Sequence, residues 1–204
     1  MSSPAVDRIK GSGLPLRGDN IDTARIIPAR FLKAITFEGL GDHVFEDDRL
    51  ARANHPFSTP AFRSAAILLV NDNFGSGSSR EHAPQALTHW GIRACIGQSF
   101  SEIFSGNSLT IGLPCATAMP DAIEFLMQTV EQAPESRLML SIDDLTVDAP
   151  GRTVQIEMPA AMREGLLGGS SDATGLLVDR YDEVRVVANR LPSVRGFLAP
   201  SSQF

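Results

Sequence analysis

The sequence predicts a single α/β layered domain over residues 1–204. A continuous apolar run of strand length stands at 65–70, and a polar, glycine-rich turn follows at 71–79. Strand-like and helix-like segments then alternate as far as 132, which is typical of a sheet with helices packed on it. An unbroken apolar run indicates a strand buried on both faces. The active edge of such a domain is expected where strands end and helices begin.

The region before the apolar run has weaker patterns. Residues 17–50 mix short apolar pieces with turn residues, which favours a strand followed by a long irregular loop. The acidic run at 46–48 is expected to be a solvated part of that loop. Residues 51–63 contain Pro56 and Pro60, so we predict a connector there that acts as a mobile flap.

A helix is predicted at 80–90, directly after the glycine-rich turn. Ser78 or Ser79 is the expected N-cap, and Gly91 is suited to end the helix. The apolar positions recur at helical spacing, which predicts one buried face. That face consists of Ala83, Ala86, Leu87 and Trp90.

Residues 119–204 are expected to hold a hairpin and the C-terminal helices. The turn residues at 148–151 predict the hairpin. The last helix carries Val184, Val187 and Leu191 at helical spacing, either as core or as a contact with a partner. The remaining predicted elements are strands at 93–97, 114–118, 141–144 and 152–157 and helices at 100–109, 121–132, 158–167 and 179–191.

The composition excludes several function classes. The net charge is −6 at pH 7 and the isoelectric point is about 5.2, which argues against nucleic-acid binding, because that binding needs an excess of Lys and Arg. The longest apolar run is too short to cross a bilayer, and the first residues lack the apolar core of a signal peptide. We therefore expect no membrane partner and a cytoplasmic location.

Cysteine and histidine give no metal-binding pattern. Cys95 and Cys115 are the only cysteines, and neither lies in a CxxC or Cys/His spacing. The chain is therefore not expected to hold a metal, and it cannot ligate an iron–sulfur cluster by itself. In the cytoplasm both thiols are expected to stay reduced.

The segment at 75–80, Gly-Ser-Gly-Ser-Ser-Arg, is the main candidate site. Its glycines allow backbone N–H groups to converge on an anion, a helix N-terminus adds partial positive charge, and Arg80 offers a planar fork for a carboxylate. The plainer alternative is a serine-rich capping turn with a surface arginine. Dinucleotide, phosphate-loop and hydrolase motifs each lack required residues here.

The candidate site at 75–80 belongs to a longer motif, and two further motifs occur elsewhere in the chain. GSGSSREHAPQAL at 75–87, SFSEIFSGNSLTIGLP at 99–114 and GDNIDTARIIPARFL at 18–32 together closely resemble the small subunits of 3-isopropylmalate dehydratase, in the aconitase superfamily. The resemblance is strongest over 16–118. It implies a swivelling β/β/α domain resembling the C-terminal domain of aconitase, which closes over the active site of a large catalytic aconitase-like subunit.

The resemblance also implies a reaction and residue roles. Family members interconvert 2-isopropylmalate and 3-isopropylmalate through isopropylmaleate in leucine biosynthesis, with a [4Fe-4S] cluster on the large subunit and no cofactor on the small one. The position of Ser78 implies the catalytic base, and those of Ser79 and Arg80 imply groups that hold a substrate carboxylate. Asp22, Thr23 and Gly77 are the further substrate-binding candidates.

The chain departs from the family pattern at two positions. Ala24 stands where many members have an acidic residue, and Ser76 stands where small subunits usually have cysteine. The loop at 26–48 corresponds to the region that helps to set substrate choice. The apolar residues of this loop are Phe31, Leu32, Ile35 and Phe37. They either form a wall for an isopropyl group or belong to the core.

Three other functions stay open at this level. The first is a paralogous dehydratase for another 2-hydroxy diacid, of the homoaconitate, citramalate or dimethylmalate type. The second is a non-catalytic regulatory subunit, which the loss of the acid at Ala24 would allow. The third is a nucleotide-binding module, because a Gly/Ser-rich helix start can hold phosphate.

Overall fold

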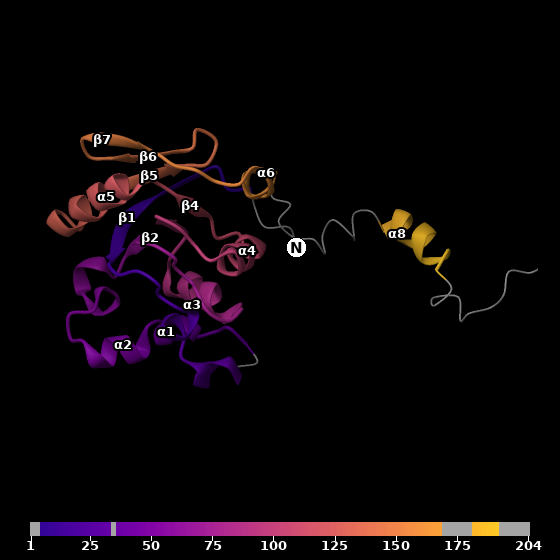
Figure 1. Cartoon of the computed structure of the whole chain (residues 1–204), viewed down its shortest axis with the longest axis horizontal. Coiled ribbons are helices and arrows are strands. Elements are labelled where there is room, and N and C mark those ends of the chain that lie inside the picture. Colours follow the sequence, from indigo (N-terminus) through magenta and orange to yellow (C-terminus); the bar gives the residue numbers. More distant parts are fainter. Residues whose placement is uncertain (1–4, 34–35, 169–180, 192–204) are drawn as a thin grey trace, which may run out of the picture.

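A computed structural model of the chain describes residues 5–33, 36–168 and 181–191. Its centre is one seven-stranded sheet in the order β4-β3-β2-β1-β5-β6-β7 (Figure 1). The strands β1 to β4 run parallel, and β5 to β7 form an antiparallel extension. The strands are β1 (Arg8–Leu16), β2 (Ala65–Val70), β3 (Ala94–Gly97), β4 (Cys115–Thr117), β5 (Arg137–Ser141), β6 (Thr146–Ala149) and β7 (Arg152–Gln155).

The apolar run at 65–70 is confirmed as a buried strand. β2 pairs with β1 on one side and β3 on the other. Its side chains alternate between two hydrophobic cores, because successive residues of a strand point to opposite faces. Leu68 and Val70 lie in one core, and Ile67 and Leu69 lie in the other.

Helices cover both faces of the sheet. One core holds α1 (Thr23–Ile26), α3 (His82–Trp90) and α4 (Glu102–Thr110), and the other holds α5 (Pro120–Gln132) and α6 (Ala160–Gly168). The predicted helices at 100–109, 121–132 and 158–167 are confirmed to within two residues. The predicted face of the helix at 80–90 is confirmed for Ala83, Ala86 and Leu87, which are fully buried, and Trp90 is partly buried against the same core.

The expectation for residues 17–50 is wrong in two respects. The strand lies earlier, at β1, and the acidic run is not a solvated loop but the start of helix α2 (Glu46–Ala51). Acidic residues favour a helix N-terminus. Two of them also bind arginines that arrive from earlier in the chain: Arg25 Nη2 lies 2.7 Å from Asp48 Oδ2, and Arg30 Nη2 lies 2.7 Å from Asp47 Oδ1.

The segment at 51–63, predicted as a connector that acts as a mobile flap, is a connector between α2 and β2 that is anchored to the core. This segment forms two short 3-10 helices, η3 (Pro56–Ser58) and η4 (Pro60–Phe62), each beginning with a proline. Phe57 is 5% exposed and His55 is 3% exposed. The buried ring of Phe57 packs against Phe45 and Trp90, so this residue anchors the segment to the core.

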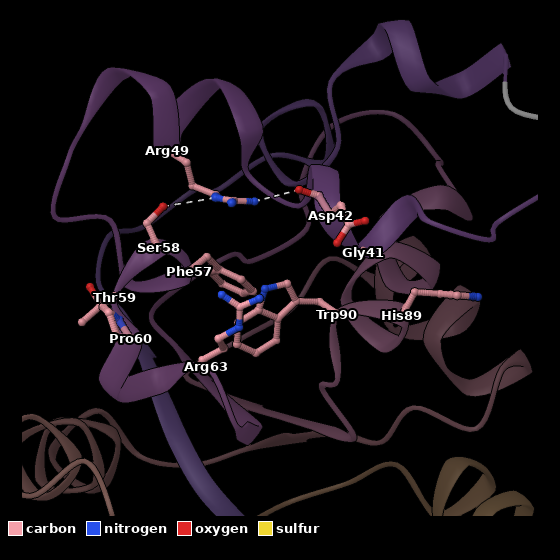
Figure 2. Close-up of a pocket in the computed structure, with 10 residues that line it drawn as sticks. All are labelled: Gly41, Asp42, Arg49, Phe57, Ser58, Thr59, Pro60, Arg63, His89 and Trp90. Atoms are coloured by element: carbon pink, nitrogen blue, oxygen red, sulfur yellow. Dashed lines mark hydrogen bonds between the residues drawn. The ribbon is translucent and has the colours of Figure 1, made fainter.

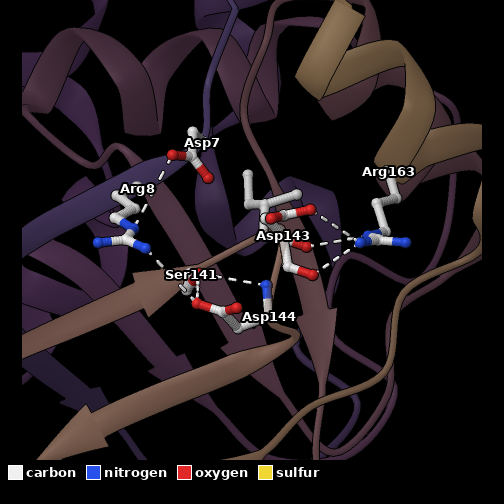
Figure 3. Close-up of polar contacts among 7 residues, drawn as sticks. Asp7, Arg8, Ser141, Asp143, Asp144 and Arg163 are labelled. Atoms are coloured by element: carbon white, nitrogen blue, oxygen red, sulfur yellow. Dashed lines mark hydrogen bonds and ion pairs between the residues drawn. The ribbon is translucent and has the colours of Figure 1, made fainter.

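The hairpin at 148–151 is confirmed as the turn between β6 and β7, with Gly151 at a positive φ of 82°. The strand predicted at 141–144 instead ends at Ser141, because the next residues form a turn. Ser141 Oγ lies 2.8 Å from Asp144 Oδ2, and Arg163 of α6 donates to the carbonyls of Ile142 and Asp143 (Figure 3). These contacts attach α6 to the antiparallel edge of the sheet.

The last predicted helix is described at α8 (Tyr181–Ala188), and residues 169–180 lie outside the described part. Val187 is 57% exposed and Leu191 is 46% exposed, so neither belongs to the core. The side chain of Val184 lies outside the described part. Every helix that the structure describes is too short or too polar to cross a membrane.

Candidate active site

The candidate loop leaves the carboxyl end of β2, at the edge where an α/β sheet usually carries its ligands. Gly75 has a φ of +77°, and a Cβ on it would lie 2.3 Å from Cγ of Phe104. Its N–H donates to the carbonyl of Ile21 at 2.8 Å. The tight approach of α4 and the backbone angle therefore both require glycine at this position.

The predicted serine cap is wrong. Helix α3 begins at His82, its N-cap is Glu81, and no side chain donates or accepts a capping hydrogen bond there. The prediction that His82 belongs to the helix start is confirmed. Ser78 and Ser79 therefore lie before the helix, and both are exposed. Their hydroxyls are available for other contacts.

The structure brings two of the sequence motifs together. Asp22 and Ser76 form a parallel β-bridge, and the N–H of Thr23 donates to the carbonyl of Ser76 at 2.9 Å. Thr23 Oγ1 donates to the carbonyl of Ser78 at 2.9 Å. Ser76 thus contributes its backbone to this contact.

Ser78 and Arg80 contact each other directly. Arg80 Nε donates to Ser78 Oγ at 3.3 Å, and Arg80 Nη1 donates to the carbonyl of Ile27 at 3.4 Å. A guanidinium beside a hydroxyl favours the deprotonated oxygen, because the positive charge stabilises the alkoxide. The same cation is suited to an incoming carboxylate.

The other predicted site residues have distinct surroundings. Asp22 caps α1, with Oδ1 accepting from the N–H of Arg25 at 2.8 Å. Thr23 is 3% exposed, and its hydroxyl contacts the candidate site through its hydrogen bond to the carbonyl of Ser78. Gly77 is exposed with a φ of +90°, a conformation that favours glycine. Ala24 is exposed on α1 and fills no core position.

Sequence reasoning did not single out Asn107. This residue of α4 lies across from the loop, where its Nδ2 is 3.5 Å from Ser79 Oγ. It belongs to the motif at 99–114, so the motif was the signal that could have identified it. α4 therefore adds an amide to a site built otherwise from the segments after β1 and β2.

A polar network also braces the loop and was not predicted. Ser99 Oγ lies 2.5 Å from Asp72 Oδ1 and accepts from the N–H of Asn73 at 2.7 Å. Asn73 Nδ2 then donates to Asn20 Oδ1 at 2.8 Å. The segments that follow β1, β2 and β3 are thereby linked behind the candidate residues.

The described apolar residues of the loop at 26–48 are neither fully buried nor fully exposed. Phe31, Leu32 and Phe37 are half-buried and pack against the core, and Ile35 lies outside the described part. Phe37 makes an edge-on contact with His82, with ring centroids 5.2 Å apart. This contact places Phe37 next to the start of α3.

The two cysteines lie in the interior of the sheet. Cys95 and Cys115 are register partners on β3 and β4, and both are buried free thiols. The hydrogen bond from the neighbouring thiol and the burial raise the pKa of Cys95. Among the described residues no three His, Cys, Asp or Glu side chains are grouped to hold a metal ion. Two buried thiols do not fit an iron–sulfur cluster.

Comparison with known proteins agrees with this architecture. The family model of the aconitase C-terminal domain matches residues 4–117. The chain is 46% identical over 188 residues to a 3-isopropylmalate dehydratase small subunit from Synechocystis, with 92% of this chain and 94% of the relative covered. It is 43% identical over 191 residues to that of Thermus thermophilus, with 92% and 95% covered.

A solved structure has the same fold. The crystal structure of 3-isopropylmalate dehydratase from Methanocaldococcus jannaschii superimposes with a TM-score of 0.65 at 24% identity, covering 85% of this chain and 95% of that one. The predicted α/β swivelling-domain class is thus confirmed. The chain belongs to the aconitase C-terminal domain family, among the 3-isopropylmalate dehydratase small subunits.

Proposed function

We propose that this chain completes the active site of a heteromeric hydro-lyase that interconverts 2-isopropylmalate and 3-isopropylmalate through isopropylmaleate. The observation that carries the proposal is the contact between Ser78 Oγ and the guanidinium of Arg80, on an exposed loop at the carboxyl edge of the sheet. A base beside a carboxylate-binding cation is what proton removal next to a carboxylate requires.

Ser78 is the proposed base. It takes the proton from the carbon next to a substrate carboxylate during dehydration and returns a proton during rehydration. A serine hydroxyl is normally far too weak an acid for this role, so its alkoxide needs positive charge at close range. Arg80 supplies that charge at 3.3 Å.

Arg80 and Ser79 are the proposed carboxylate ligands. The bonds from Arg80 Nε and Nη1 hold the guanidinium in place, and Nη2 has no partner among the described residues. An arginine held in this way binds a carboxylate with directed, charge-assisted hydrogen bonds. Ser79 adds a hydroxyl that Asn107 orients from α4.

Asp22, Thr23 and Gly77 complete the proposed substrate site. Thr23 acts through the carbonyl of Ser78, which its hydroxyl holds in position. Asp22 pairs with Ser76 and caps α1, so it holds the first motif against the loop. Gly77 provides the backbone turn between Ser76 and Ser78.

The proposed partner is a large catalytic aconitase-like subunit, and the proposed compartment is the cytoplasm. A [4Fe-4S] cluster on that subunit would supply the Lewis acid for the departing hydroxyl. No residue of this chain is assigned to the cluster. The small subunit contributes the base and the carboxylate grip, and its open loop is covered when the two chains meet.

The test is reconstitution with the large subunit. We expect Ser78→Ala to lower kcat by about a hundredfold or more, and Arg80→Lys to lower kcat/KM by about tenfold or more. Ser64→Ala and Arg137→Lys are matched controls, since both residues are exposed and their side chains have no partner among the described residues. Both controls should keep wild-type turnover.

Three results would contradict the proposal. Near wild-type turnover of Ser78→Ala or Arg80→Lys would remove these residues from the chemistry. Equal activity of the large subunit with and without this chain would instead assign a regulatory role. Preference for citramalate, dimethylmalate or homocitrate over isopropylmalate would assign a paralogous dehydratase, because each of these lacks the isopropyl group.

A further inference from the structure

A cavity of about 300 Å³, whose lining is shown in Figure 2, includes His89 and Trp90 and so lies at the opposite end of α3 from the loop at 75–80. Residues of the 3-10 helix η2 (Leu40–His43), α2, the segment 57–63 and the last turn of α3 line it. None of its lining residues belongs to the loop at 75–80 or to the motif at 18–32. The helix between the two sites is nine residues long, so they lie about 13 Å apart along its axis.

Two guanidinium groups reach the cavity from opposite walls. Arg49 extends from α2, where its Nε donates to Ser58 Oγ at 3.2 Å and its Nη1 donates to the carbonyl of Asp42 at 2.8 Å. These neutral partners position the cation and leave its charge uncompensated. Arg63 rises from the other wall toward Trp90 in Figure 2, and its side chain has no hydrogen bond or ion pair with any described residue.

Nearby carboxylates do not neutralise this charge. The acidic residues of α2 are paired with other cations: Glu46 and Asp47 with Arg30, and Asp48 with Arg25. Asp42 is the one acidic residue in the lining, against Arg49 and Arg63. The cavity therefore has a net positive lining and is suited to a monoanion.

Apolar side chains form the inner wall. The rings of Phe57 and Trp90 meet edge to face, with centroids 4.8 Å apart, and Phe57 is buried. Gly41 packs so closely that a Cβ on it would lie 2.5 Å from the backbone N of Trp90. The ring of His89 points away from the cavity in Figure 2, so His89 adds no charge inside it.

We propose that this cavity binds a small organic carboxylate that carries an apolar group. The carboxylate lies between Arg49 and Arg63, and the apolar group packs on Trp90 and Phe57. Arginine forks match carboxylates, and small-molecule sites combine an apolar wall with a few convergent polar groups. The site contains neither Ser78 nor Arg80, so the inference stands independently of the proposed function.

Tryptophan fluorescence of the full chain tests the inference directly. Trp90 is the only tryptophan of the chain, so its emission reports on this cavity. We expect a saturable change of emission on titration with phenylacetate or isovalerate, and a weaker response to acetate, which lacks the apolar group. Phenylacetamide has the same shape without the charge and should give no saturable change. A flat response to all three carboxylates, or an equal response to the amide, would overturn the proposal.

Variants locate the binding site. Arg63→Met removes a charge that has no structural partner among the described residues, and it should raise the Kd for phenylacetate by about tenfold or more. Arg137→Met and Arg80→Met should leave that Kd unchanged. An unchanged Kd for Arg63→Met, or loss of binding in Arg80→Met, would contradict the assignment to this cavity.

A second experiment distinguishes two possible occupants of the cavity in the assembled enzyme: a free carboxylate ligand and an acidic side chain of the large subunit. Ligand-observed NMR with phenylacetate should detect binding to the reconstituted complex as well as to the full chain alone. Binding to the chain that disappears on assembly would overturn the assignment to a free carboxylate, because the partner would then occupy the cavity.

Discussion

Thr23 Oγ1 donates a hydrogen bond to the carbonyl oxygen of Ser78 at 2.9 Å, although the two residues are 55 positions apart in the chain. The neighbouring N–H of Thr23 binds the carbonyl of Ser76. The loop that carries the proposed base is therefore held by the first motif at two points, the carbonyls of Ser76 and Ser78. This pairing gives a structural reason for the two motifs to occur together.

Thr23→Val should separate positioning from stability. The variant keeps the shape of the side chain and loses one hydrogen bond, so the free energy of unfolding should fall by only about 1 kcal/mol. Turnover of the reconstituted enzyme should fall more, by about tenfold, because Ser78 is no longer held in place. Steady-state kinetics and urea unfolding measure the two effects. Thr23→Ser keeps the hydroxyl and should restore turnover; a Thr23→Val enzyme with wild-type kcat would contradict a positioning role.

Gly75→Ala should be strongly destabilising. The new Cβ would meet the ring of Phe104 at 2.3 Å on a backbone with a φ of +77°. Overpacking and the left-handed conformation together predict a loss of about 2–5 kcal/mol in the free energy of unfolding. Gly106→Ala is the matched control on α4, because a Cβ there meets nothing within 4 Å. The control should be neutral or stabilising by up to about 1 kcal/mol, and equal effects of the two substitutions would argue against the close packing at Gly75.

Asn107→Ala tests the contact that the sequence did not reveal. Loss of the amide frees Ser79, so we expect KM to rise about threefold to tenfold with kcat little changed, as for the loss of one neutral hydrogen bond to bound substrate. Asn107→Asp places a negative charge where a substrate carboxylate is proposed to bind, and it should raise KM further than the alanine variant. An Asn107→Asp enzyme with wild-type KM would place the substrate carboxylate elsewhere.

His55 predicts a pH dependence of stability. Its ring is buried and Nδ1 accepts from the N–H of Phe57, and burial lowers the pKa of His55 below its ordinary value of 6.5. The unfolded state then binds the proton more readily, so the free energy of unfolding should fall as the pH drops through about 6.5. Above that value the contribution is fully present. Urea unfolding between about pH 7.5 and about pH 5.5 measures this term, since carboxyl groups titrate near pH 4.

His55→Asn is the control for that measurement. Asparagine keeps an acceptor for the N–H of Phe57 and cannot take up a proton in this range. The decline in stability over the same pH interval should therefore be smaller than in the wild type. An identical decline in both proteins would assign the pH dependence to other groups.

Hydrophobic periodicity predicted the helices correctly where one continuous face of the segment packs against the sheet. The helices at 121–132 and 158–167 are examples, because the spacing of their apolar residues along the sequence defines the buried face of the helix. Local patterns were misleading at 46–48 and 51–63. The acidic run begins a helix and pairs with Arg25 and Arg30, and the proline-rich segment is anchored to the core where Phe57 packs on Phe45 and Trp90. These partners are distant in sequence, so no local pattern could reveal them.

By itself the sequence determined the α/β class, the buried strand β2, the family of the chain and the loop at 75–80 as the candidate site, since these depend on composition, periodicity and contiguous motifs. Only the tertiary structure decided that Thr23 holds Ser78, that Asn107 reaches Ser79, and that Arg49 and Arg63 face one cavity. The physical reason is that hydrogen bonds and charges act over a few ångströms, and the fold decides which distant residues come that close.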